Sequence, residues 1–275
     1  MKSWDEVGLS DDFMFGKVMQ DPDLCKELLR RILPEIEIDH IEYPELQKAM
    51  KPDRDDHGIR LDLYVRDDKN SVYDIELQAV NTGELPKRSR YYQSIIDLQL
   101  IDAGESYKKL SQSYIIFICL EDVFGYGRHK YTFSNLCEED KHIRLEDKTT
   151  KIFLNASGTM DDVDDKLKVF LDFVADKEVD AEDEYIKRLQ IALEKARRNK
   201  DWRHEYMTLQ MRDQENIERG IAIGKQEGLK EGEEKNILSS IRKLMNNLKL
   251  PMNSAMDALE IPDEQRAYYA EQLKN

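Results

Sequence analysis

Two carboxylates, Asp62 and Glu76, lie on neighbouring segments whose residue pattern predicts a pair of strands. Apolar and polar residues alternate through 59–66, which is the period of a strand with one buried face. After the turn-forming run Asp-Asp-Lys-Asn, a second alternating segment covers 72–80. Asp62 falls on the polar face of the first strand, and Glu76 shares a face of the second with Gln78. The predicted hairpin therefore gathers two carboxylates and one amide.

Carboxylates on facing strands repel each other unless a cation lies between them or one of them stays protonated. Mg²⁺ prefers one or two carboxylates together with water and substrate phosphate oxygens. Asp62, Glu76 and the backbone carbonyl of Leu77 could therefore hold one Mg²⁺ ion. The same spacing also fits a hairpin whose polar face is simply solvated.

Four short motifs occur in a fixed order around this hairpin. They are D-x-x-F on an early helix, R-x-D on one strand, E-x-Q on the next strand and Arg-Tyr on the following helix, at residues 12–15, 60–62, 76–78 and 90–91. With this ordered set the chain resembles the bacterial recombination-promoting nuclease family, a transposase-like branch of the PD-(D/E)XK nucleases, over residues 8–175. In one respect it departs from the wider superfamily, because Gln78 stands where E-x-K has lysine.

The resemblance implies an enzyme, a Mg²⁺-dependent DNA endonuclease that hydrolyses phosphodiester bonds in recombination or mobile-element DNA, with Mn²⁺ as a possible substitute. Asp62, Glu76 and the Leu77 carbonyl would bind the metal, which lowers the pKa of a bound water. Gln78 would position that water, since an amide is no base. No DNA-joining chemistry can be inferred from these residues.

Two further residues are implied as members of the site. Arg90, on the helix after the second strand, would hold the phosphate or the developing negative charge, and an exposed arginine or a salt bridge is the alternative. Asp12 would be an additional acidic metal ligand. Its alternative is compensation of the helix dipole in a first turn.

Two other functions remain open. The first is a catalytically inactive PD-(D/E)XK fold that binds DNA or a protein partner as an oligomer, which Gln78 and the low isoelectric point favour. The second is a regulatory oligomer in which the C-terminal helices are the functional part.

Three nearby candidates are set aside. The pair Pro52-Asp53 resembles the "PD" of the signature but precedes the strand, whereas Asp62 lies within one. His57 is a single histidine in a polar loop, and such residues are more often at the surface than catalytic. Asp122 follows a strand and is interpreted as a turn residue.

The composition limits the class of protein. The chain of 275 residues has a net charge of −15 and a pI near 4.9, which argues against unspecific coating of DNA by its whole surface. Its apolar runs are too short to cross a bilayer, and residues 1–12 lack the apolar core of a secretory signal. Three widely spaced cysteines suit reduced thiols. We expect a bacterial cytoplasmic protein without a membrane partner.

The elements that position the site read as an α/β fold. Helices are expected from Asp11 to Met19, over 23–33 and over 86–103, with Ser10 as the first cap. Strands are expected at 36–43, 114–120, 129–133 and 150–155, and a polar loop at 46–58. The run 114–120 is continuously apolar, which is typical of a central strand buried on both faces. The resemblance implies a restriction-endonuclease-like core, a mixed central sheet flanked by helices, with an α-helical C-terminal extension.

Four regions are expected: a nuclease-like domain (1–175), a long charged helix (176–216), a glycine-repeat linker or oligomerising helix (217–236) and a small helical bundle (237–275). One continuous helix is predicted over 183–217. Residues 186–212 contain eight basic and three acidic residues, and we interpret this stretch as a solvated face of the helix.

Glycines recur every fourth residue in the third region, at Gly220, Gly224, Gly228 and Gly232. Since each glycine costs roughly 1 kcal/mol in a helix, the repeat indicates either a tight helix–helix seam or a partly helical linker. The bundle after it is marginal alone, so a homodimer or higher homo-oligomer through the C-terminal helices is expected. Its acidic residues outnumber its basic ones, which argues against a DNA-reading helix-turn-helix there.

Overall fold

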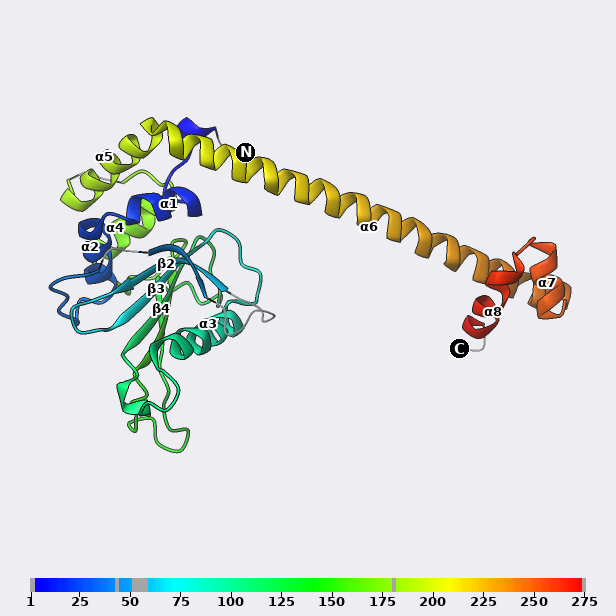
Figure 1. The fold of residues 1–275 in the computed structure, drawn as a ribbon, viewed down its shortest axis with the longest axis horizontal. Coiled ribbons are helices and arrows are strands. Elements are labelled where there is room, and N and C mark those ends of the chain that lie inside the picture. Colours follow the sequence, from blue (N-terminus) through cyan, green and yellow to red (C-terminus); the bar gives the residue numbers. More distant parts are fainter. Residues whose placement is uncertain (1–2, 43–44, 51–58, 180–181, 274–275) are drawn as a thin grey trace. The chain divides into compact units, whose positions relative to one another are not determined.

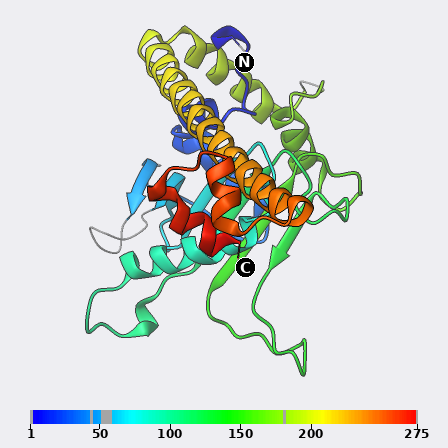
Figure 2. The same cartoon turned by 90° about the vertical axis from the view of Figure 1, so that its right-hand side faces the viewer.

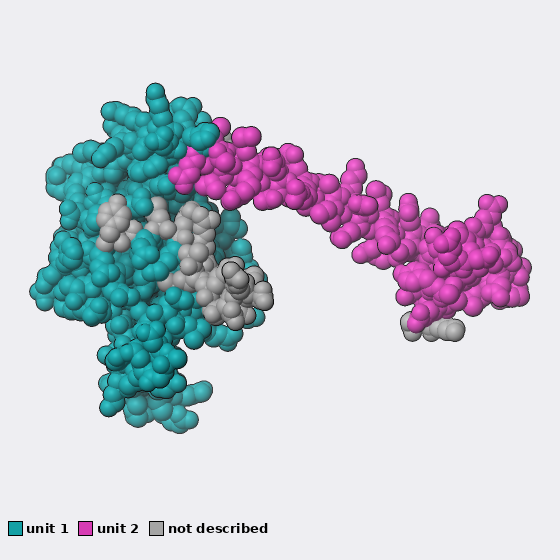
Figure 3. All heavy atoms as spheres, viewed as in Figure 1, with its two compact units in different colours: residues 1–204 teal, residues 205–275 magenta. Residues whose placement is uncertain are grey.

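The computed structural model describes residues 3–42, 45–50, 59–179 and 182–273. The chain divides into two compact units, residues 1–204 and 205–275, which are described separately (Figure 3). The first unit extends beyond the expected boundary at residue 175. It also includes the helix that follows that point.

A mixed six-stranded sheet forms the centre of the first unit (Figure 1). The spatial order of the strands is β1-β2-β3-β4-β6-β5, with parallel pairing in β3–β4 and β4–β6 and antiparallel pairing elsewhere. The bounds are β1 Glu45–Met50, β2 Ile59–Arg66, β3 Val72–Gln78, β4 Ser113–Cys119, β5 Lys130–Phe133 and β6 Thr149–Asn155. β4 is buried along its whole length, as its apolar run predicts. The expected mixed α/β sheet is thereby confirmed.

Helices cover the two faces of this sheet (Figures 1 and 2). Helix α3 (Leu85–Leu100) packs on one face, where Leu85, Tyr92 and Ile96 share a core with strand residues such as Phe117 and Phe153. The opposite side carries α1 (Asp12–Met19), α2 (Pro22–Ile32), α4 (Asp165–Val174) and α5 (Glu184–Arg198). Two short 3₁₀ turns, Trp4–Glu6 and Tyr107–Lys109, complete the unit.

The sequence-based expectation was wrong in the segment before β2. No ladder forms over 36–42, where Ile41 makes only an isolated bridge to Asp67, and β1 lies instead inside the expected polar loop. The alternating isoleucines Ile38 and Ile41 are buried without a strand partner. β1 exists because β2 offers it an edge to pair with, and tertiary pairing overrides local pattern in strands.

Two helix expectations also need correction. The cap of α1 is Asp11, whose carboxylate accepts the Met14 N–H, whereas the Ser10 hydroxyl donates to Asp176. The single helix expected over 183–217 is broken at Asn199, which is extended and accepts N–H bonds from Asp201 and Trp202. Asparagine at this position is an effective N-cap, so a new helix begins at the next residue.

That helix, α6 (Lys200–Leu248), enters the second unit at residue 205 and extends through the glycine repeat. Its last turns pack with α7 (Met252–Ala258) and α8 (Asp263–Gln272) around a small apolar core that includes Ile241, Met256 and Tyr269. None of the described helices is both long and apolar enough to cross a lipid bilayer.

Candidate active site

The two predicted carboxylates meet where the ladder between β2 and β3 ends. Their registered pairs run from Arg66–Val72 to Leu63–Ile75, and the next pair would be Asp62 and Glu76. There the Asp62 N–H donates to the Glu76 side-chain oxygen Oε1 at 2.9 Å. Because this carboxylate takes up a backbone donor, both acidic residues are held in one place at the end of the hairpin.

A single arginine joins the carboxylate to the amide. Arg88 on α3 donates from Nη2 to Glu76 Oε2 at 2.8 Å and from Nη1 to Gln78 Oε1 at 2.9 Å. Its Nε donates to the Tyr92 hydroxyl at 2.7 Å. The guanidinium also lies 5.1 Å from the Tyr92 ring centroid and 5.8 Å from that of Phe117. Arg88 is thus fixed on three sides.

Gln78 is oriented by the same network. Its carbonyl oxygen faces Arg88, so its amide nitrogen donates to the Leu77 carbonyl at 2.9 Å. That carbonyl is the backbone oxygen predicted as a metal ligand. A carbonyl has two lone pairs, so this hydrogen bond leaves one free for a cation.

Asp74, two residues before Glu76 on β3, is a third carboxyl of the site that the sequence analysis missed. It is fully buried, and neither of its oxygens accepts a hydrogen bond from a donor among the described residues. Burial raises its pKa well above the ordinary value, and the charges of Glu76 and Asp62 add to the rise. A protonated Asp74 can donate to Glu76 and thereby lowers the pKa of Glu76. The two-residue spacing on one strand face was the available signal.

The site has an excess of negative charge. Burial raises the pKa of Asp62 to about 8, with the Glu76 and Asp12 carboxylates contributing, while a Leu77 backbone hydrogen bond and Arg88 act in the opposite direction. Burial likewise raises the pKa of Glu76, against the Asp62 N–H and Arg88. Arg88 compensates one of these carboxylates, so the others must keep a proton or gain a cation.

A divalent cation suits this donor set. Two carboxylates and a carbonyl are the hard oxygen ligands that Mg²⁺ takes while keeping several waters. Within the described ranges, no group of three or more His, Cys, Asp or Glu side chains is arranged as a complete metal cage. The fit is therefore to a cation that protein, water and substrate coordinate together.

The structure brings some predicted residues together and not others. Asp62, Glu76, Leu77 and Gln78 form one cluster. Arg90 is exposed on α3, and the arginine that contacts Glu76 and Gln78 is Arg88, two residues earlier. Arg88 could have been recognised from the sequence, since it lies in helical phase with the apolar residues Leu85, Tyr92 and Ile95.

The remaining candidates lie around this cluster or outside the described residues. Asp12 is exposed at the start of α1, where it influences Asp62 electrostatically and accepts the Phe13 N–H. Asp122 accepts N–H bonds from three residues of its own loop and a bond from the Tyr131 hydroxyl, as a turn residue would. Pro52, Asp53 and His57 fall outside the described residues.

A comparison with known families gives one match. The model of the family described as "PD-(D/E)XK nuclease family transposase" matches residues 12–217, most of the chain. The chain belongs to this PD-(D/E)XK nuclease family. No curated protein and no solved structure matches it. The matched region includes every site residue named above and ends within α6, before the glycine repeat.

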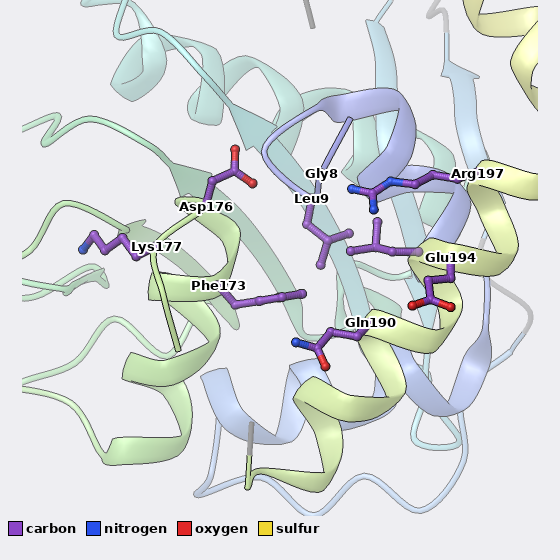
Figure 4. A pocket seen from close by; sticks show the side chains of 9 residues that line it. Gly8, Leu9, Phe173, Asp176, Lys177, Gln190, Glu194 and Arg197 are labelled. Carbon is purple, nitrogen blue, oxygen red and sulfur yellow. The ribbon is translucent and has the colours of Figure 1, made fainter. Parts of the chain in front are cut away.

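A pocket elsewhere on this PD-(D/E)XK nuclease family member was considered as an alternative site. It measures about 530 Å³ and lies between the segment at Gly8 and Leu9, the end of α4, and α5 (Figure 4). Its charged groups already have partners, since Arg197 donates to the Val7 carbonyl and Asp176 accepts from Ser10. We therefore assign the catalytic chemistry to the carboxylate cluster.

Proposed function

We propose that this protein is a metal-dependent DNA endonuclease that uses Mg²⁺, with Mn²⁺ as a possible substitute, and acts in recombination or on mobile-element DNA. Membership of a nuclease family supports this class of reaction. The observation that carries the proposal is the joining of Asp62 and Glu76 at the end of the β2–β3 ladder, with Arg88 donating both to the Glu76 carboxylate and to the Gln78 amide oxygen.

Asp62, Glu76 and the Leu77 carbonyl would hold the cation, with Asp12 as a further candidate ligand. A divalent cation there supplies positive charge to the phosphate and makes a water molecule more acidic. Glu76 keeps its orientation because Asp62 N–H and Arg88 hold one oxygen each. Asp74 contributes a proton that stabilises the Glu76 carboxylate.

Gln78 and Arg88 act on the substrate side. The amide of Gln78 can orient a water by hydrogen bonding but cannot remove its proton. Arg88, with about a third of its side chain exposed, can donate to a phosphate oxygen while its remaining contacts keep it in place. We therefore propose Arg88, in place of Arg90, as the group that stabilises the developing negative charge.

The test is cleavage of supercoiled plasmid by the purified full chain, with Mg²⁺ or with EDTA. We expect cleavage by the wild type only with metal, and none by Asp62→Ala or Glu76→Ala. Arg88→Ala should lower the rate by about 10²–10³-fold, the usual effect of removing one charge-stabilising donor. Glu182→Ala, at an exposed carboxylate, is the control and should cleave normally. Undiminished cleavage by either Asp62→Ala or Glu76→Ala would contradict the proposal.

A catalytically inactive fold that binds DNA or a partner is the second candidate. It is favoured by Gln78 in place of lysine and by the fact that protein donors already contact both Glu76 oxygens. Calorimetry distinguishes the two candidates. Metal binding that requires Asp62 and Glu76, without cleavage under any metal, would support the inactive fold.

A further inference from the structure

Two basic side chains, Lys87 and Arg90, lie exposed on the first turns of α3, one on each side of Arg88 in the sequence. We call them the cation pair. Neither forms a salt bridge with any residue in the described part of the chain. Residues 85–92 contain no acidic residue, and the described N-cap residue Glu84, three positions before Lys87, forms no salt bridge with it.

Acidic residues outnumber Lys and Arg by 57 to 42 over the whole chain. Some cations in the described part of the chain have a carboxylate partner, as Lys177 has Asp172 and Lys235 has Glu231, and others on exposed helix faces form no salt bridge. What distinguishes Lys87 and Arg90 is their position on the helix that carries Arg88 into the site. An unpaired positive surface here is therefore available to an external anion.

The pair also lies beside the catalytic carboxylates. Arg88 reaches Glu76 and Gln78 from the packed side of α3, and neighbouring residues on a helix are offset by about 100° and 1.5 Å. Lys87 and Arg90 are three residues apart, so they share one face, with Cβ atoms about 5–6 Å from each other. Helix α3 thus directs one cation into the site and two outward next to it.

We propose that Lys87 and Arg90 bind backbone phosphates of the DNA strand that passes the site, adjacent to the phosphate that Arg88 contacts. The inference rests on the proposed nuclease function and adds to it a surface that binds DNA independently of base sequence. Lysine supplies a compact charge, and arginine a fork that fits phosphate oxygens. The positive end of the α3 dipole adds to the same potential.

The test is the salt dependence of duplex DNA binding by the full chain in EDTA, where no cleavage occurs. Each lost phosphate contact lowers the slope of log affinity against log salt by about 0.9 for B-DNA. We expect Lys87→Ala/Arg90→Ala to bind duplex DNA more weakly. Its slope of log affinity against log salt should be shallower by the amount that about two phosphate contacts contribute. The charge-conserving variant Lys87→Arg/Arg90→Lys should keep the wild-type slope, and thermal melting checks that all variants are folded.

Lys225→Ala/Lys230→Ala is the matched control. It removes the same net charge from exposed positions of α6, in the other compact unit, and should leave the slope unchanged. A wild-type slope in the Lys87→Ala/Arg90→Ala variant, or an equal loss in the control, overturns the inference.

Failure of the inference and failure of the nuclease proposal give different results. If the wild type cleaves DNA and the slope does not depend on the cation pair, only the inference fails. If the slope depends on the pair and no variant or metal gives cleavage, the surface is supported and the nuclease proposal fails. If the wild type binds no duplex DNA at any salt concentration, the proposed DNA-binding surface is contradicted.

Discussion

At the scale of one residue, Asp74 shows that a buried acidic site lowers the stability of the fold. Its carboxyl is fully buried beside two others and has no donor among the described residues. Such a group is buried most cheaply in its neutral form, since an unpaired charge away from water is strongly destabilising. The residue therefore links stability to pH.

We predict that Asp74→Asn stabilises the protein at high pH. In the wild type the raised pKa values of Asp74 and Asp62 mean that the folded state binds protons the unfolded state has lost. Their contribution is fully present below the ordinary Asp pKa. The part due to Asp62 is lost as pH rises towards about 8, and the part due to Asp74 is lost as pH rises through its own raised pKa. The amide carries no such penalty, so we expect a gain of about 1–3 kcal/mol at pH 8.

Urea unfolding at pH 5 and pH 8 in EDTA measures this effect. The difference between variant and wild type should be larger at pH 8. Asp140→Asn, at an exposed carboxylate, serves as control and should change little at either pH. A stability difference that does not depend on pH would contradict the assignment.

At the scale of elements, the hairpin was predictable and the helix that completes the site was only partly so. Alternation placed Asp62, Glu76 and Gln78 correctly on β2 and β3, because a two-residue period leaves only two faces. The arginine that contacts the carboxylate and the amide is Arg88 and not the motif residue Arg90, since a motif gives a residue type without the rotation of the helix. The packing of Leu85 and Tyr92 sets that rotation, and Arg88 follows from it.

Some elements could not be predicted from local sequence at all. β1 depends on the edge of β2, and Asp74 reads as one more polar residue until the burial of its strand face is known. The cap at Asn199 was hidden inside a continuous helical pattern. For β1 and Asp74, contacts distant in sequence decided between two locally acceptable structures, whereas the cap at Asn199 uses the N–H groups of Asp201 and Trp202 nearby in sequence.

The glycine repeat gives a prediction for α6 itself. Around all four glycines, a Cβ atom would meet no atom of the described residues within 4 Å, so alanine fits each position. Replacing Gly220, Gly224, Gly228 and Gly232 by alanine should stabilise the helix by about 0.8–1 kcal/mol per site. Thermal melting followed by circular dichroism at 222 nm measures the gain.

Gly83→Ala is the contrasting control. Its backbone has a φ of +73°, which alanine adopts only with strain, so the same substitution should destabilise. If the four-alanine variant melts no later than the wild type, the repeat is not helical in solution. A gain in helix stability together with weaker self-association would favour the tight-seam interpretation of the glycines.

At the scale of the whole molecule, chemistry and the C-terminal bundle lie in different units. Every proposed catalytic residue belongs to residues 1–204, and the family match ends at residue 217. The bundle has its own apolar core around Ile241. This division suggests that catalysis and self-association can be separated.

We predict that deleting residues 218–275 leaves plasmid cleavage within a few-fold of the full chain and converts a homo-oligomer into a monomer. Light scattering after size exclusion gives the mass, and the plasmid assay gives the activity. Loss of cleavage by a truncated chain that still melts cooperatively would mean that the tail takes part in catalysis. An unchanged oligomer would place the self-association surface in the first unit.

The contact between Arg88 and Glu76 also bears on whether the protein folds before or after it binds a metal ion. Because a side chain of the same polypeptide neutralises the buried Glu76 carboxylate, and protons can neutralise the other two carboxylates, the core can close without a metal. With the proposed metal mechanism, the chain therefore folds before it binds the ion. The supply of the ion then controls when cleavage occurs and does not affect whether the protein folds.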